Sequence, residues 1–555
     1  MTVFLLSCLF RRQVYAFQLT RRQTSFVPRA RILSRLYSTI NNDLMEDDTI
    51  FALSSGGSAA QATAVAIIRI SGTQAPAILQ SLTTPGTLLP KPRYAALRKL
   101  YYKEQPLDQA LVLYFPGPNS FTGEDVVELH CHGSRAVVQG VLEAISDSSK
   151  LARYAEAGEF TQRAWRNGKM DVLQVEALAD LLTADTNTQR LQALQQLEGK
   201  LSETYQSWRE KLIAGLAHAE AVIDFGDDER FGDDDFEDPE VGRRLQQESV
   251  WGGVIDQMQS LCKEMEVQLS DQRRGELVRE GVRISILGPP NAGKSSLFNV
   301  LAQRDAAIVS DTPGTTRDVL ELTLNLGGVK CILQDTAGVR TETEDTIERE
   351  GMKRAFAAAS QADLIVSMVD STDYQAGINI LNRVLTECIR SEEGDDDNDD
   401  DIGVSGVGSL TPESVLLVRN KYDLLSDGRT SLDPATTNDL AGIFDISCVT
   451  QEGIDHFLES LTSLVLSRVS GTEPSSSSRY PGEGALITRA RHRQHARSAV
   501  DALNRFDFLS RQGTIAVDMA AEELRLAASE LGRITGAVDV EDVLDKLFTD
   551  FCIGK

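Results

Sequence analysis

The spacing of hydrophobic and polar positions changes along the chain, and each change marks a predicted domain boundary. From residue 48 to residue 168, short apolar runs alternate with turn-rich loops, a pattern typical of mixed helices and strands. An α/β N-terminal domain is therefore expected. Its clearest predicted elements are three strands and then a helix, at Val65 to Ile70, Ala110 to Phe115, Val126 to His130 and Arg135 to Ile145.

Apolar residues recur at helical spacing in two separate stretches. Between Asp171 and Asp224 they return every three or four residues, and another helix is expected from about 242 to 275. The same spacing resumes from Ile487 to Leu509 and from Val517 to Phe548. These stretches predict one helical domain in two parts, residues 169–278 and 485–555.

An α/β unit interrupts the predicted helical domain. Residues 279–468 contain short apolar runs of strand length, with an acidic insertion at 391–410. Residues 469–484, rich in Ser, Gly and Pro, then form a linker. We therefore expect a multidomain chain in which a compact α/β unit is inserted into a discontinuous α-helical domain.

The first 42 residues differ in composition from the rest. They contain seven arginines and neither Asp nor Glu, which is typical of an organelle transit peptide. The Arg-rich stretch up to Arg35-Leu-Tyr-Ser38 favours a mitochondrial address. A short secretory segment at Val3 to Phe10, leading to a plastid, is the alternative.

The composition of the chain argues against several classes of protein. The net charge of −26 argues against a protein that coats nucleic acid through its overall field. Seven cysteines without a Cys-x-x-Cys pair indicate reduced thiols rather than a disulfide framework. No apolar run reaches the roughly 18 residues that a membrane span needs.

The most informative stretch runs from Gly288 to Ser296, Gly-Pro-Pro-Asn-Ala-Gly-Lys-Ser-Ser, between a strand-like run and a helical pattern. Backbone N–H groups of such a glycine turn, with the following helix N-terminus, surround phosphates. Lys294 adds a positive charge near the outer phosphates, and the Ser295 hydroxyl is a ligand for Mg²⁺. This stretch is therefore predicted to be a P-loop.

Three further motifs follow strands downstream, and together they predict a Ras-like GTPase domain. Asp335-Thr-Ala-Gly338 suits a Mg²⁺-bound water and a γ-phosphate. In Asn420-Lys-Tyr-Asp423, Asp423 can accept two hydrogen bonds from guanine, which adenine does not offer. Ser447-Cys448 can support the base through backbone N–H groups. The predicted GTP-binding residues are Asn291, Ala292, Gly293, Lys294, Ser295, Ser296, Ser310, Asp311, Thr312, Pro313, Gly314, Thr315, Thr316, Asp335, Thr336, Ala337, Gly338, Asn420, Lys421, Asp423 and Ser447.

A switch is expected between the P-loop and Asp335. In Gly314-Thr-Thr-Arg-Asp318, Thr316 is the candidate second protein ligand to Mg²⁺, ordered with GTP and released after hydrolysis. Val339, which follows Gly338, cannot orient a water in the way that glutamine does in Ras-type domains. Another group must do that work.

These motifs resemble one family closely, the MnmE/TrmE tRNA-modification GTPases, over Thr49 to Lys555 apart from insertions. The resemblance implies a folate-binding N-terminal domain and a GTPase that acts with an FAD-containing partner of the MnmG/GidA type. Together such proteins build a carboxymethylaminomethyl-type or taurinomethyl group on C5 of the tRNA wobble uridine. It also implies a homodimer through the N-terminal domain, with the GTPase domains meeting across the nucleotides. The resemblance rests on Ile67-Ile-Arg-Ile-Ser-Gly72, Phe115 to Glu128, Gly158 to Ala164, Asn167-Gly-Lys169, the GTPase motifs and Phe551-Cys-Ile-Gly-Lys555.

The resemblance also implies how water is activated. A K⁺ ion would be held by Asn291 with Ser310, Thr312 and Thr315, where it offsets the charge that develops between the phosphates. Glu348 matches the family's catalytic glutamate, which acts through a bridging water. A one-residue insertion keeps Glu344 as the alternative.

For folate, the resemblance implies a site made by Arg69, Glu128, Lys169 and Lys555. The carboxylate would bind the pterin, and the cations would meet the glutamate tail. Cys552 is either a catalytic thiol near the one-carbon unit or a packing residue. The loop from Ser55 to Thr63 departs from the Gly-Arg-Gly-Gly type common in the family, which leaves its ligand contacts open.

Two other classes share the nucleotide motifs. An Era-type ribosome-assembly GTPase would carry a basic RNA-binding module with a GxxG loop after them, whereas this chain continues into helices and Cys-Ile-Gly-Lys. A GTP-gated scaffold, in which slow hydrolysis only times release, predicts that Glu348→Ala leaves tRNA modification intact. The GTPase-driven interpretation predicts that both hydrolysis and modification are lost.

Overall fold

The computed structural model describes most of the chain from residue 48 onward, in two compact units. The described residues are 48–55, 63–226, 239–271, 273–308, 320–335, 357, 359–373, 378–379, 381, 412–425, 440–470, 487–512, 517–538, 544, 547–549, 551 and 554. The transit peptide and the acidic insertion predicted from the sequence lie outside these residues. The first unit is residues 1–169 with 552–555, and the second is residues 170–551.

The N-terminal unit is built on one six-stranded sheet. Its strand order is β3-β4-β5-β2-β1-β6, antiparallel except for the β1–β6 pair. Alternation along β2 directs Ala66, Ile68 and Ile70 into a core beneath α3 and α4, while Arg69 faces the other way. The elements are β1 (Thr49–Leu53), β2 (Thr63–Ser71), α3 (Ala75–Ser81), β3 (Ala96–Tyr102), β4 (Gln105–Phe115), β5 (Val126–Gly133), α4 (Arg135–Ser148), β6 (Ala152–Tyr154) and α5 (Glu159–Arg166).

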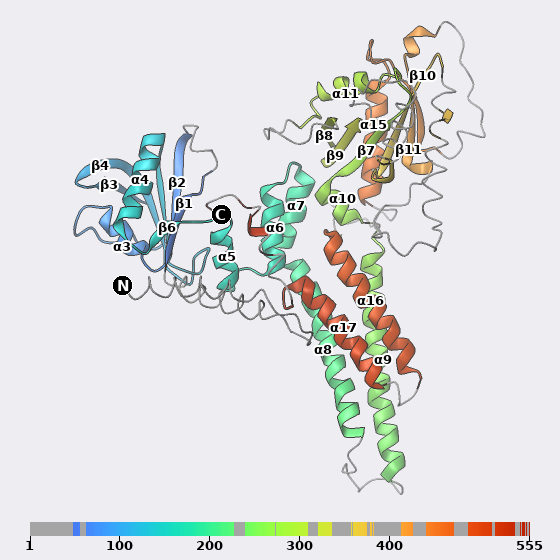
Figure 1. Cartoon of the computed structure of the whole chain (residues 1–555), viewed down its shortest axis with the longest axis horizontal. Coiled ribbons are helices and arrows are strands. Elements are labelled where there is room, and N and C mark those ends of the chain that lie inside the picture. The colour runs from blue at the N-terminus through green and yellow to red at the C-terminus, as the bar shows by residue number, and fades with distance from the viewer. Residues whose placement is uncertain are drawn as a thin grey trace, which may run out of the picture. The chain divides into compact units, whose positions relative to one another are not determined.

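The second unit contains a bundle of long helices (Figure 1). Helices α8, α9, α16 and α17 pack along one another around Tyr205, Trp208, Leu212, Phe506 and Leu524. Shorter helices α6 and α7 precede the bundle, and both begin with a capping box. The helices are α6 (Val172–Leu182), α7 (Asn187–Leu197), α8 (Lys200–Gly226), α9 (Pro239–Leu269), α10 (Arg274–Glu280), α16 (Ala490–Ser510) and α17 (Val517–Thr535).

Two helices are shorter than the apolar spacing predicted. The helix expected up to residue 275 ends at Leu269, and α10 starts after Arg273, which has a φ of 62°. The expected run from Val517 to Phe548 ends at Thr535, where Gly536 takes a φ of +88°. A left-handed residue directly after Thr535 stops α17 whatever the apolar spacing, and Gly536 was the sequence signal for this break.

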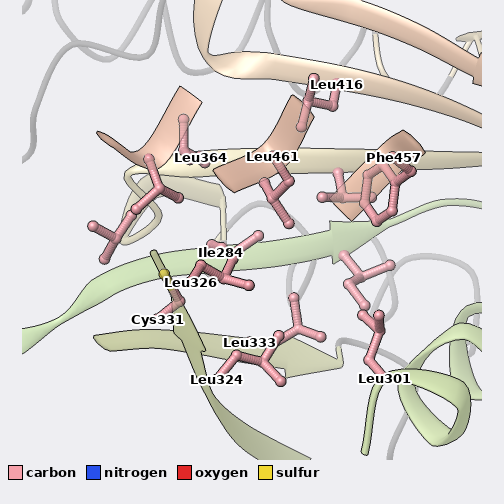
Figure 2. Close-up of a cluster of buried hydrophobic side chains, with 14 of the residues drawn as sticks. Ile284, Leu301, Leu324, Leu326, Cys331, Leu333, Leu364, Leu416, Phe457 and Leu461 are labelled. Atoms are coloured by element: carbon pink, nitrogen blue, oxygen red, sulfur yellow. The ribbon is translucent and has the colours of Figure 1, made fainter. Parts of the chain in front are cut away.

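The α/β unit between α10 and α16 has a sheet of order β12-β11-β10-β7-β9-β8, parallel except for β8. Figure 2 shows Phe457 and Leu461 of α15 among side chains of the sheet, including Ile284 and Leu364. The elements are β7 (Val282–Leu287), α11 (Lys294–Ala302), β8 (Leu320–Leu326), β9 (Val329–Asp335), β10 (Leu364–Asp370), η1 (Pro412–Ser414), β11 (Val415–Asn420), η2 (Tyr422–Leu424), β12 (Gly442–Asp445) and α15 (Ile454–Ser470).

No helix in the described part of the chain is long and apolar enough to cross a membrane. Within the same residues, no group of three or more His, Cys, Asp and Glu side chains is arranged to hold a metal ion. In the α/β unit, the predicted nucleotide motifs follow the parallel strands β7, β9 and β11 on one edge of the sheet, where ligands of such sheets bind.

Candidate GTP site

The P-loop turns sharply between β7 and α11, and it does so through residues with positive φ. Asn291 has a φ of 63° and Gly293 a φ of +100°. A Cβ at Gly293 would lie 2.0 Å from Nδ2 of Asn420, so only glycine fits there. Helix α11 begins immediately afterwards at Lys294, which brings the N-terminal end of the helix to the loop. This is the geometry of a phosphate site.

The Lys294 side chain is buried and folded back along the loop. Its Nζ donates to the carbonyl oxygens of Gly288 at 2.8 Å and Pro289 at 2.9 Å. These contacts hold the ammonium at the mouth of the loop. A phosphate bound there would meet a cation that is already in position, with the Ser295 hydroxyl exposed at the start of the same helix.

Asn420 joins the phosphate loop to the region predicted for the base. It is the last residue of β11 and is almost fully buried. Its Nδ2 donates to the carbonyl of Ala292 at 2.9 Å, and its Oδ1 accepts from the backbone N–H of Cys448 at 3.2 Å. One amide therefore fixes the P-loop relative to the Ser447-Cys448 turn. The sequence motif predicted a nucleotide contact for Asn420 but gave no sign of this bridging role.

The guanine motif continues in the short helix η2. Asp423 lies there with its carboxylate exposed, free of the sheet and open to a base. Lys421, with a φ of 62°, donates to Oδ2 of Asp370 at 2.7 Å. Burial raises the pKa of the Asp370 carboxyl, but hydrogen bonds from Lys421 and Thr372 outweigh burial and lower it overall. Asp370 was not predicted from the sequence, because it belongs to no motif and its partner Lys421 is 51 positions away along the chain.

Cys448 is half-buried beside this motif. Burial, together with the charge of Asp423, raises the pKa of its thiol to about 11. The thiol is therefore neutral at physiological pH and is not a reactive nucleophile. The backbone N–H groups of Cys448 and Ser447 donate to Asn420 Oδ1 and to the Glu452 carbonyl, so the support of the base expected from this turn stays a prediction.

A second constellation lies on the N-terminal sheet. Arg69 and Glu128 are directly opposite each other on β2 and β5, with Arg69 Nε 3.1 Å from Glu128 Oε1. The Arg69 guanidinium lies 5.4 Å from the centre of the Phe121 ring and 5.7 Å from that of Phe160. The pair is only partly exposed, and it offers a carboxylate, a cation and an aromatic wall.

Another predicted folate residue, Lys169, contacts a loop beside this sheet. Lys169 Nζ donates to the Pro118 carbonyl at 3.0 Å, in the turn-rich loop 117–123. Gly554, the neighbour of Lys555, accepts from the Ser54 hydroxyl at 2.9 Å, at the end of β1. Because Ala52 on β1 pairs with Arg69 on β2, Gly554 meets the strand beside that of Arg69. The aromatic pair Phe121 and Phe160 was missed, since neither residue stands in a charged or ligating pattern.

Comparison with known proteins then identifies the family. The family model described as the MnmE helical domain matches residues 172–552, and that of the GTP-binding protein TrmE N-terminus matches residues 49–169. The chain belongs to the MnmE/TrmE family of tRNA modification GTPases.

The relatives cover nearly the whole chain. The MnmE tRNA modification GTPase of Parvibaculum lavamentivorans is 43% identical over 513 residues, covering 92% of this chain and 100% of that protein. The mitochondrial 5-taurinomethyluridine tRNA synthase subunit GTPB3 of Homo sapiens is 42% identical over 517 residues, with 91% and 93% covered. That of Danio rerio is 40% identical over 515 residues, with 92% and 93% covered.

Family membership makes this chain a GTPase of multidomain architecture. Several of the predicted site residues lie outside the described part of the chain, so their contacts stay predictions. They are Ser310 to Thr316, Thr336 to Gly338, Glu344, Glu348, Cys552 and Lys555. The backbone of Asp335 closes β9, as expected for the residue that opens the Asp-Thr-Ala-Gly motif.

Proposed function

We propose that this MnmE-family GTPase modifies C5 of the wobble uridine in organellar tRNA, together with an FAD-dependent partner of the MnmG/GidA type. The group added is carboxymethylaminomethyl-type or taurinomethyl, and a folate supplies its one-carbon unit. The observation that carries the proposal is the join between phosphate and guanine motifs through Asn420, in a chain whose relatives are named as tRNA modification proteins.

The residues present fit GTP and Mg²⁺. Lys294 and the start of α11 meet the phosphates, Asp423 accepts from the guanine, and Ser295 with Thr316 would hold Mg²⁺. A K⁺ ion, when bound, would offset charge that develops between the phosphates. Asn291 stands at the exposed turn of the P-loop, where its side chain is free to ligate K⁺ together with Ser310, Thr312 and Thr315. Glu348 would orient the attacking water.

The N-terminal unit fits a reduced folate. Glu128 can accept hydrogen bonds from the pterin N–H groups, and Phe121 and Phe160 offer the ring a flat surface beside Arg69. Lys169 and Lys555 would meet the glutamate tail, and Cys552 would lie near the one-carbon unit. A binding measurement with a reduced folate on Glu128→Gln reports on this site separately from GTP.

The same sheet supports a homodimer through the N-terminal domain. Leu97 on β3 pairs with Leu111 on β4, and Leu111 pairs with His130 on β5, on the face of the sheet that holds Arg69. Val65, Leu97 and Leu111 are all exposed there. Apolar side chains in a row on an open sheet face suit burial against a second copy.

The relatives named as mitochondrial, together with the Arg-rich leader, support a mitochondrial location, with a plastid as the alternative.

Family membership disfavours the Era-type alternative, because the match extends over residues 172–552, well beyond the GTPase domain. A GTP-gated scaffold remains the competing interpretation.

The deciding measurement is GTP hydrolysis by the chain without residues 1–42, in KCl and in NaCl at equal ionic strength. Both salts screen alike, so a difference in rate reports the ion itself. We expect hydrolysis to be at least about tenfold faster in KCl, a preference worth about 1.4 kcal/mol in the barrier. Asn291→Ala should abolish the preference while GTP still binds. Equal rates in both salts would contradict a K⁺-completed site.

A further inference from the structure

Two segments of the chain connect the GTPase domain to the helical domain, and we call them the entering passage and the returning passage. The short helix α7 makes hydrogen bonds to both of them. The entering passage is α10, and the returning passage is residues 487–493, which lead into α16. Helix α7 presents three buried glutamines on one face. Their Nε2 atoms donate to the Arg279 carbonyl at 2.9 Å, the Gly275 carbonyl at 3.2 Å and the Thr488 hydroxyl at 2.9 Å, from Gln189, Gln192 and Gln196 respectively.

The two passages also touch each other directly. A Cβ at Gly275 would lie 2.3 Å from the Ile487 carbonyl oxygen, so the passages cross at van der Waals distance. Arg493 of the returning passage is buried, and it donates to Asp271 Oδ1 at 2.6 Å and to Glu276. We call residues 271–281 together with 487–493 the crossing.

One carboxylate on α6 binds both sides of the crossing. Oδ1 of Asp180 accepts from Arg279 Nε at 3.0 Å and from Arg489 Nη2 at 2.8 Å. Asp180 and both arginines are mostly buried. Movement of either passage would therefore change the hydrogen bonds of Asp180. If one arginine moves away, the Asp180 carboxylate keeps only one of these two partners.

The crossing is also linked to the nucleotide sheet. Lys330 on β9 donates to Asp185 Oδ2 at 2.6 Å, just before α7. Strand β9 runs from there to Asp335, the first residue of the γ-phosphate motif. A cavity of about 150 Å³ lies between these contacts, lined by residues that include Asp180, Gln192, Arg279 and Lys330. The cavity leaves space in which β9 and α7 can move relative to each other.

We propose that Asp180 is a positioning residue that couples GTP hydrolysis to tRNA modification, through its double contact with Arg279 and Arg489. A change at the nucleotide end of β9 reaches the crossing through Lys330 and α10. Asp180 then transfers it to the helical domain. This inference rests on the proposed function. It requires the coupling to fail when Asp180 loses its charge, while the GTP site itself stays intact.

The test compares Asp180→Asn with Glu264→Gln, both in the full-length chain with its FAD-dependent partner and tRNA. Glu264 is the matched control, because it also accepts two hydrogen bonds, from Trp208 and Lys211, but both donors belong to α8 and lie away from the crossing. We expect Asp180→Asn to keep K⁺-stimulated GTP hydrolysis within about twofold and to lose at least tenfold in modified uridine per GTP hydrolysed. Glu264→Gln should leave both unchanged.

Two further measurements separate this inference from misfolding and from failure of the proposed function. Lys330→Met removes only a partly exposed ion pair, so it should fold normally and lower the modification yield in the same direction. Spin labels at the exposed positions Glu203 and Glu459 report the distance between the helical and GTPase domains. In the wild type this distance should differ between GDP and a GTP analogue, and in Asp180→Asn the difference should shrink.

The outcomes are distinct. Unchanged modification by Asp180→Asn, or a parallel loss of hydrolysis and modification, would overturn the coupling role. A wild-type chain that hydrolyses GTP yet never modifies tRNA would refute the proposed function. The distance measurement would then still decide whether Asp180 links the two domains.

Discussion

The carboxylate of Glu176 lies almost fully buried on α6, beside three basic side chains of the returning passage. Its Oε1 accepts from Arg491 at 3.0 Å, and its Oε2 lies 3.0 Å from His492 Nε2 and 3.4 Å from Arg489. Burial alone raises the pKa of this carboxyl, but the charges of His492, Arg489 and Arg491 outweigh burial and lower it to about 2. Burial also lowers the pKa of His492, although Glu176 opposes that shift.

Both shifts predict that the helical core loses stability in acid. A group whose pKa is lower in the folded state contributes stability above its unfolded pKa and loses it as the pH falls. The loss should begin below about pH 6.5 as His492 protonates in the unfolded chain, and it should steepen between about 4.5 and 2 through Glu176. Thermal unfolding followed by tryptophan fluorescence, which reports this core through Trp208, measures the slope.

Glu176→Gln isolates the carboxylate. At pH 7 the variant should lose about 3 kcal/mol, because Arg489 and Arg491 keep their charge without this partner. Below pH 4.5 its unfolding temperature should fall less steeply with pH than that of the wild type. Identical pH profiles for the two chains would show that Glu176 is not the titrating group.

Whether the role of a single residue could be predicted from the sequence depends on how close its partners are along the chain. Lys294 and Asp423 could be assigned because their motifs are local, and the backbone geometry around each is fixed within a few residues. The bridging role of Asn420 could not, because its partner Ala292 is 128 positions away. Asp180 was out of reach for the same reason, with partners 99 and 309 positions away.

Among the helices and strands, prediction from the sequence was most accurate where a single spacing of apolar residues continued without interruption. Strands β2, β4 and β5 and helix α4 were predicted with shorter bounds, and α8 and α16 followed from their apolar spacing. Strands β1, β3 and β6 were missed, since their pattern is set by pairing with neighbours rather than by a local period; β3 and β6 are the edges of the sheet, and β1 lies between β2 and β6. The break at Gly536 was missed because a single backbone angle, not apolar spacing, ends that helix.

A pair of glycine variants tests the close approach of helix α10 to the returning passage. Gly275→Ala places a methyl group 2.3 Å from the Ile487 carbonyl, so the passages must separate, at a cost of about 1 to 3 kcal/mol. Gly252→Ala, within α9, meets nothing within 4 Å and should stabilise the chain by about 0.5 to 1 kcal/mol. Denaturant unfolding of both variants measures the contrast. Equal effects would show that the passages are not in contact in solution.

For the chain as a whole, the acidic net charge of −26 restricts how tRNA can be held. Many arginines of the described helices already pair with carboxylates, among them Arg493 with Asp271 and Arg525 with Glu220. Charge neutralised in this way is not available to phosphates. Most of the basic surface for tRNA is therefore expected on the FAD-dependent partner.

Salt dependence measures where the phosphate contacts lie. Each phosphate neutralised contributes about 0.7 to 0.9 to the slope of log affinity against log salt. The slope for tRNA binding should be near zero to about 2 for this chain alone, and should steepen by several units when the partner is added. A steep slope for the chain alone would place the basic surface on this protein instead.

The contact between Ser54 and Gly554 also bears on biosynthesis. The two residues are 500 positions apart. The ribosome makes residues 170–551, the whole second unit, before it reaches Gly554, so the end of β1 meets this partner only after that unit has been synthesised. The N-terminal unit, made first, is thus completed last.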